Sequence, residues 1–149
     1  MKKVKYLILT LLMAVGFTAN LSAQNDLAIN KVFERYGKQK GSVMVEMSRE
    51  MLKEYDFTYY KSIVTTDNKE AADFARECLE VDQKGAKKVK QVVSNGVLSS
   101  IYLQFPQKGK YFRLVLFNET ITPERKMTLI YIESEKDSEE ILKIVLKKR

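Results

Sequence analysis

Three consecutive predicted β-strands within residues 96–132 constrain the fold more than any other part of the chain. Each is rich in β-branched, aromatic and long aliphatic residues. The strands cover residues 97–105, 111–118 and 126–132. A five-residue link containing Pro106 and Gly109 joins the first two, and a short link containing Pro123 joins the last two. Because short links force neighbouring strands to run antiparallel, we predict a three-stranded meander.

The residues before and after the meander predict further strands and helices. Apolar residues recur at helical spacing in residues 26–36, 69–80, 86–93 and 138–148, and a short helix is predicted at 49–55. Strands are predicted at residues 42–47 and 61–66. This mixed order, combined with a meander, indicates the α+β class. We therefore expect a single antiparallel or mixed sheet, made of the meander and about two earlier strands, with helices packed mainly on one face.

The first 23 residues predict a signal peptide. Lys2, Lys3 and Lys5 precede an apolar run at residues 6–17, and Leu21-Ser22-Ala23 has the small residues of a cleavage site. An uncleaved N-terminal anchor is the alternative, although the run is shorter than the roughly 20 residues of a membrane span. We expect residues 24–149 to form one α+β domain, exported to the periplasm or secreted, with no integral membrane segment once the signal is removed.

Composition limits the partners of the mature chain. Of the 26 Lys and Arg residues, three lie in the predicted signal, so 23 remain against 19 acidic residues and the net charge is +4. This ordinary balance, together with export, argues against nucleic acid as a partner. Cys78 is the only cysteine, so an internal disulfide is excluded. It lies on the apolar stripe of the predicted helix 69–80, where we expect a buried thiol that packs as a small hydrophobic residue.

Histidine is absent from the chain. Its absence removes the Ser–His and Cys–His nucleophile pairs, the usual general base and the commonest transition-metal ligand. With one cysteine, an ordinary zinc site cannot be built, and the six glycines form no phosphate-binding motif. We therefore predict no catalytic, cofactor-binding or metal-binding residues, no cofactor, and a protein that is not an enzyme.

Residues 55–60 concentrate four aromatic side chains in six positions: Tyr55, Phe57, Tyr59 and Tyr60. Packing between the sheet and its helices is the favoured interpretation, since large aromatic residues commonly fill such gaps. A ligand platform is the alternative. Our first hypothesis is a non-catalytic binding module that uses these four residues or an exposed sheet face, with another envelope protein or a second copy as partner.

Two alternative functions rest on charged residues. Glu46, Glu50 and Glu54 recur every four positions, and a close pair of them would allow carboxylate-dependent hydrolysis of envelope or dietary polymers. The basic residues of 84–90 and 147–149 would allow peripheral binding to an anionic membrane surface. Exposed helical Glu and Lys residues are more often a solvated surface, which favours the binding module over both.

A pattern of hydrophobic and glycine positions runs through most of the mature chain. It includes the segments FERYGKQKGSVMVEMSREML, YYKSIVTTD and ECLEVDQKGAKKVK, then TLIYIE and the terminal EILKIVLKK. This pattern resembles small exported domains of unknown function from Gram-negative gut bacteria. The resemblance implies an exported, periplasmic protein, and it carries over neither an activity nor any site residues.

Overall fold

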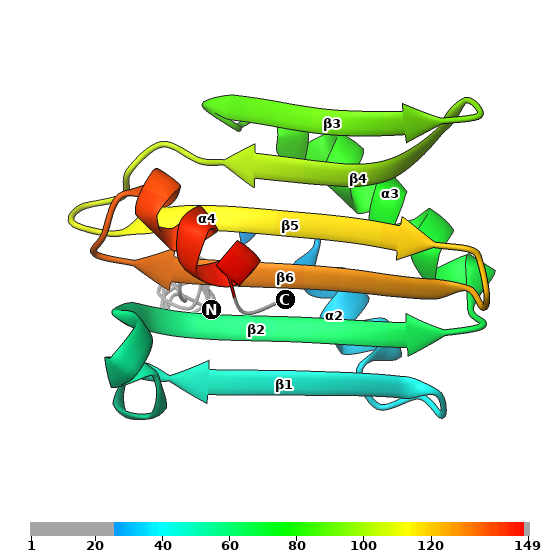
Figure 1. The fold of residues 1–149 in the computed structure, drawn as a ribbon, viewed down its shortest axis with the longest axis horizontal. Helices are drawn as coiled ribbons and strands as arrows, with labels where there is room; N and C mark the ends of the chain where they lie inside the picture. The colour runs from blue at the N-terminus through cyan, green and yellow to red at the C-terminus, as the bar shows by residue number, and fades with distance from the viewer. Residues whose placement is uncertain (1–25, 148–149) are drawn as a thin grey trace, which may run out of the picture.

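The computed structural model describes residues 26–147, which form a six-stranded antiparallel sheet with helices on both faces (Figure 1). The predicted signal peptide lies outside the described residues. Along the chain follow α2 (Asn30–Tyr36), β1 (Ser42–Ser48), the 3-10 helix η3 (Arg49–Tyr55), β2 (Phe57–Thr66), α3 (Lys69–Gln83), β3 (Lys88–Ser94), β4 (Val97–Gln104), β5 (Phe112–Thr120), β6 (Lys126–Ser134) and α4 (Ser138–Lys147). The α+β class and the single sheet are thus confirmed for this part of the chain, with six strands rather than about five.

The strand order is β1-β2-β6-β5-β4-β3. Strands β3 to β6 form a meander in which each strand pairs with the next, and β1 pairs with β2. Helix α3 carries the chain behind the sheet from β2 to β3, so that the meander returns and β6 pairs with β2 (Figure 1). Strand β5 lies inside the sheet, between β4 and β6.

The prediction of a helix at residues 86–93 is wrong, because this segment contains β3. Two adjacent residues in the following turn, Asn95 and Gly96, both have positive φ, at 53° and 76°. An Asn-Gly pair in that conformation joins the two strands of a hairpin. The three valines of the segment favour a strand. They also fit the period of a helix, and the antiparallel pairing with β4 makes the segment a strand.

Helices α2 and α3 cover one face of the sheet, which we call the α2–α3 face (Figure 1). Alternate residues of the central strands point into this layer, as the two-residue period of a strand requires. Its largest buried side chains include Tyr36, Ile63, Leu79, Ile101, Leu103, Phe117, Met127, Leu129 and Tyr131. Cys78 lies in the same layer, and burial raises the pKa of its thiol, so its predicted packing role is confirmed.

The opposite face, the α4 face, is covered by α4 and by η3. The expectation that helices pack mainly on one face is therefore wrong. The reason is the pattern of the central strands, whose second set of alternate residues is also apolar and needs cover. The buried residues of this layer are Leu52, Phe57, Tyr102, Leu114, Ile130, Ile132 and Ile141. In Figure 1, α4 crosses only one end of β5 and β6.

The start of α2 depends on a residue far away in the sequence. The sequence predicts a helix over residues 26–36, but α2 begins at Asn30. The carboxylate of Asp82, at the end of α3, accepts hydrogen bonds from the backbone N–H groups of Ala28 (2.6 Å) and Ile29 (2.9 Å). Those donors would otherwise be buried without partners. Asp82 therefore joins the two helices of the α2–α3 face.

Candidate binding groove

The aromatic segment of residues 55–60 is divided between the two faces of the sheet. Strand β2 begins at Phe57, four residues earlier than predicted, and its pairing with β6 shifts between Phe57 and Tyr59. This irregularity places Phe57 and Tyr60 on the α4 face. Tyr59 points to the α2–α3 face, where its ring packs edge-on against Tyr131 and its hydroxyl donates to Glu46 (2.6 Å).

Tyr55, Phe57 and Tyr60 line an apolar groove of about 280 Å³ on the α4 face. We call it the aromatic groove. One wall is η3 and the other is α4, while β2 and β6 provide its floor and the edge strand β1 provides Met47. Among residues 26–147, the lining consists of Met47, Leu52, Tyr55, Phe57, Tyr60, Ile130, Ile144 and Val145. Three of the four aromatic residues singled out in the sequence are thus brought together, and Tyr59 is not.

The described residues that line the aromatic groove include no charged side chain. Phe57 is buried and stacks on Tyr55, with ring centroids 6.0 Å apart, so the two rings form a fixed wall. Tyr60 and Met47 are half-buried, which leaves part of each accessible. Tyrosine offers a large apolar area with few rotatable bonds, and methionine adapts its shape to what it contacts. The groove is therefore suited to apolar groups rather than to ions.

Sequence reasoning missed the contribution of α4 to this groove. Ile144 and Val145 come from a helix more than eighty residues away from Tyr55 and Phe57 in the sequence. Val145 belongs to the apolar stripe that we expected to dock the helix, but a stripe does not indicate where it will dock. The missing signal was the number of apolar faces on the sheet, because a second apolar face requires a second cover.

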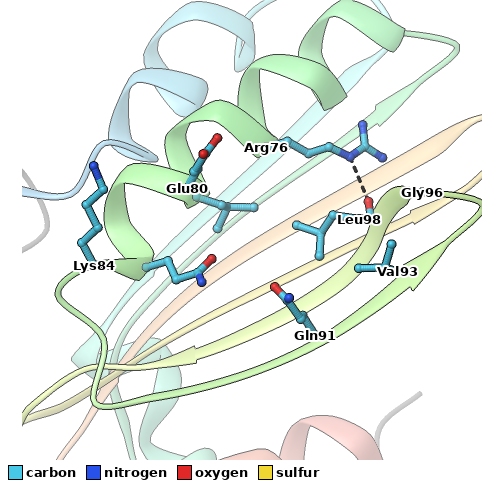
Figure 2. A pocket seen from close by; sticks show the side chains of 9 residues that line it. Arg76, Glu80, Lys84, Gln91, Val93, Gly96 and Leu98 are labelled. Carbon is cyan, nitrogen blue, oxygen red and sulfur yellow. Dashed lines mark hydrogen bonds between the residues drawn. The ribbon is translucent and has the colours of Figure 1, made fainter.

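A second groove, of about 580 Å³, lies between α3 and the hairpin of β3 and β4 (Figure 2). Glu80 lies on α3 and Lys84 directly follows it, while Gln91 and Val93 lie on β3 opposite. Arg76 reaches from α3 to the backbone carbonyl of Leu98, to which its Nε donates at 2.8 Å (Figure 2). This groove is more polar than the aromatic groove.

Arg76 belongs to a buried ion-pair cluster. Its guanidinium contacts the carboxylate of Glu119, whose side chain is only 2% exposed, and Arg125 contacts the other oxygen of Glu119 at 3.1 Å. Asp73 adds a contact to Arg76 at 3.2 Å. The cluster joins α3 to β5 and to the loop before β6. Arg76 is therefore engaged in holding the fold together, which leaves Glu80 and Lys84 as the charges that this groove offers.

The three carboxylates of the hydrolase alternative do not share a cavity. Glu46 points to the α2–α3 face and accepts from Tyr59. Glu50 and Glu54 are exposed on η3, and all three lie outside the linings of the two grooves. Among residues 26–147, no three His, Cys, Asp or Glu side chains are grouped so that they could hold a metal ion.

The basic residues of 84–90 do not lie on the predicted helix: Lys84 follows the end of α3, and Lys87 lies in the link before β3. Lys88 and Lys90 belong to β3, and Lys88 is paired with Glu139 of α4 at 3.1 Å. Lys147 is exposed at the end of α4, and residues 148–149 lie outside the described part of the chain. No helix within residues 26–147 has the length and apolar character needed to cross a membrane.

Fold and groove together define an α+β protein with a twice-covered antiparallel sheet and an apolar surface groove. The chain belongs to DUF6108, a family of unknown function whose model matches residues 16–145. Comparison with curated proteins found no match. The expected likeness to a family of unknown function is thus confirmed, while export and a Gram-negative gut bacterium as the source stay predictions.

Proposed function

We propose that this protein is an exported, non-catalytic binding module whose aromatic groove holds apolar side chains of another envelope protein. The observation that carries the proposal is the convergence of Tyr55, Phe57 and Tyr60 with α4 on one uncharged groove. Tyrosine and methionine are enriched where proteins bind one another, and residues in apolar pockets contribute most of the binding energy.

The dimensions of the groove favour a protein segment over a cofactor. Pockets for small molecules commonly measure about 300–1,000 Å³ and contain a few polar groups that orient the ligand. The aromatic groove, at about 280 Å³, is slightly smaller and its lining is uncharged. A few apolar side chains fit such a space, and the exposed backbone of the same partner segment would remain in contact with water at the rim.

Export is supported by the basic residues, the apolar run and the cleavage site of the predicted signal peptide. Mass spectrometry of the protein isolated from the periplasm tests this part of the proposal. We expect a mature chain that begins at Gln24. A chain that retains Met1 and is recovered from the cytoplasm would contradict it.

Photo-crosslinking from neighbouring positions tests the binding role. A photoreactive phenylalanine analogue in place of Tyr60 lies in the aromatic groove, whereas the same analogue in place of Tyr59 lies on the other face of the sheet. In intact cells we expect a discrete adduct with one envelope protein from position 60, and little or none from position 59.

A second variant links the adduct to the groove itself. Ile144→Arg places a charge in the lining and should abolish the adduct from position 60, while Lys143→Ala, on the neighbouring exposed residue, should leave it intact. Circular dichroism confirms that each variant is folded. Equal crosslinking from positions 59 and 60, or an adduct that survives Ile144→Arg, would refute the proposed site.

A further inference from the structure

The two edges of the sheet differ in how well they are protected against pairing. Strand β3, at one edge, carries Lys88 and Lys90, and its pairing with β4 is interrupted by a bulge near Val92. Lysines and bulges are the devices by which proteins prevent strand addition at an edge. Strand β1, at the other edge, contains no lysine and no irregularity in its pairing with β2.

Strand β1 also exposes apolar side chains. Val43 is 63% exposed and Val45 is 39% exposed, and both lie with Met47 on the α4 face. Burying these valines would remove apolar surface from water, which is favourable. The edge strand therefore combines exposed apolar side chains with an unprotected edge.

The hydrogen-bonding pattern shows which backbone groups of β1 point outward. The N–H of Thr66 donates to the carbonyl of Gly41 (3.1 Å), and these two residues lie one position beyond Ser42 and Thr65, the pair at the end of the β1–β2 register. Because hydrogen-bonded pairs alternate along an antiparallel ladder, the odd-numbered residues of β1 bond to β2. The backbone groups of the even-numbered residues, Met44 and Glu46 among them, point to the open edge.

We propose that β1 pairs antiparallel with β1 of a second copy of this chain, around a two-fold axis through Val45. This register places Met44 opposite Glu46 of the second copy and Ser42 opposite Ser48. Every outward-pointing residue of one β1 thus meets an outward-pointing residue of the other, which is the condition for hydrogen-bonded pairs. The N–H of Ser42 already donates to the carbonyl of Gln39 (3.1 Å), so at that pair only the N–H of Ser48 is left to bond across the new edge. The two sheets would become one continuous sheet.

The side chains and charges of β1 are self-complementary in this register. On the α4 face, Val45 meets Val45 of the second copy, and Val43 meets Met47. Glu46, the only charged residue of the strand, lies opposite an apolar residue rather than opposite its own copy. Beyond the strand, exposed Lys40 of one copy approaches exposed Glu50 of the other, so opposite charges meet at both ends.

The pairing adds a residue to the aromatic groove. Met47 belongs to its lining, so Val43 of the second copy would extend the apolar surface beside it. The pairing does not depend on what occupies the groove. Failure of the crosslink from position 60 would therefore leave the proposed dimer untouched, and a monomeric protein would leave the groove untouched.

Sedimentation of the protein, expressed from its full-length sequence and purified, tests the pairing. We expect the wild type to be a dimer. Val45→Lys should give a monomer, because two lysines would meet at the axis, whereas Val92→Lys on the β3 edge should remain a dimer. Val92 is a matched control because it is also an edge valine and is 56% exposed. A monomeric wild type, or a dimer that survives Val45→Lys, would overturn the proposal.

Single cysteines test the register itself. Residues in a non-hydrogen-bonded antiparallel pair have Cα atoms about 4.5 Å apart, which is within the range of a disulfide. Val45→Cys should therefore form an intermolecular disulfide under mild oxidation. Val43→Cys should not, because its copies would lie about 13 Å apart along the strands. The native Cys78 is buried and does not interfere. Equal crosslinking of the two variants would contradict the register.

Discussion

The two faces of the sheet are covered to different extents. On the α2–α3 face, the two helices are joined to each other by Asp82 and to the sheet by Arg76. On the α4 face, a ten-residue helix and one 3-10 helix cover part of a similar area. The aromatic groove lies where the two covers fail to meet.

This difference separates stability from recognition. The α2–α3 face contains the large core cluster and the buried ion pairs, so substitutions there should lower the free energy of unfolding. The α4 face leaves apolar side chains half-buried, so substitutions there should affect binding more than stability. The predictions below test this contrast, from the largest expected effect to the smallest.

Two leucines in neighbouring strands provide the most direct test. Leu129 is fully buried on the α2–α3 face, and Leu116 is half-buried on the α4 face. We expect Leu129→Ala to lower the free energy of unfolding by about 2–5 kcal/mol, because it leaves a cavity in a packed core. Leu116→Ala should cost about 1 kcal/mol, in proportion to the smaller area buried. Urea unfolding with a common m-value measures both, and equal losses would refute the contrast between the faces.

The ion-pair cluster predicts the next largest effect. Glu119→Gln leaves Arg76 and Arg125 facing a neutral side chain, and we expect a loss of about 3 kcal/mol. This is the lower part of the range for buried pairs, because both arginines are partly exposed. Glu124→Gln, on an exposed neighbour, should change the free energy of unfolding by less than about 0.5 kcal/mol. An unchanged free energy of unfolding for Glu119→Gln would show that the cluster does not hold α3 to the sheet.

Asp82 provides a smaller effect on the same face. Asp82→Ala removes the acceptor of two backbone N–H groups, and we expect a loss of about 1–2 kcal/mol. Glu80→Ala, two residues earlier on the exposed side of α3, is the control. Hydrogen exchange locates the effect, since the amides of Ala28 and Ile29 should lose protection before those of the sheet.

Tyr102 should show a change of the opposite sign on the α4 face. Its hydroxyl is buried and has no hydrogen-bond partner among the described residues. Tyr102→Phe should therefore raise the free energy of unfolding at neutral pH by up to about 1 kcal/mol, because a buried unpaired hydroxyl is costly. A loss of stability in the same urea experiment would show that the hydroxyl does have a partner.

Alkaline pH should enlarge the advantage of Tyr102→Phe. Burial, reinforced by Glu139 and Asp137, raises the pKa of Tyr102 to about 12. Between about pH 10 and pH 12 the folded state keeps a proton that the unfolded state loses, so the wild type loses stability as the pH rises. The Phe variant has no hydroxyl at this position, so it does not lose stability with rising pH through Tyr102. Unfolding measured at about pH 7 and about pH 10.5 should show a larger difference at the higher pH.

Most of the elements could be predicted because their signals are local. The strands of the meander, the edge strand at residues 42–48 and the helices α3 and α4 each show a clear period in a window of about ten residues. The error at residues 86–93 has the same origin. Valines at positions 89, 92 and 93 fit the helical period, and the pairing with β4 that makes this segment a strand is a non-local property.

Only part of the aromatic groove could be predicted, for a related reason. The concentration of aromatic residues at 55–60 is visible in the sequence, but the irregularity after Phe57 and the position of α4 are not. Alternation within a strand separates Tyr59 from Tyr60, and this much follows once the strand is known to begin at Phe57. The position of α4, more than eighty residues later in the sequence, determines which face of the sheet is incompletely covered.

By itself, the amino-acid sequence determined the α+β class, the antiparallel meander, the burial of Cys78 and the absence of histidine chemistry. These features follow from composition or from the pattern of residues close together in the sequence. The tertiary structure alone decided that both faces are covered, that Asp82 starts α2 and that η3 and α4 leave a groove between them. Each of these depends on contacts between segments that are distant in the sequence. Such contacts contribute free energy only once the fold has packed those segments together.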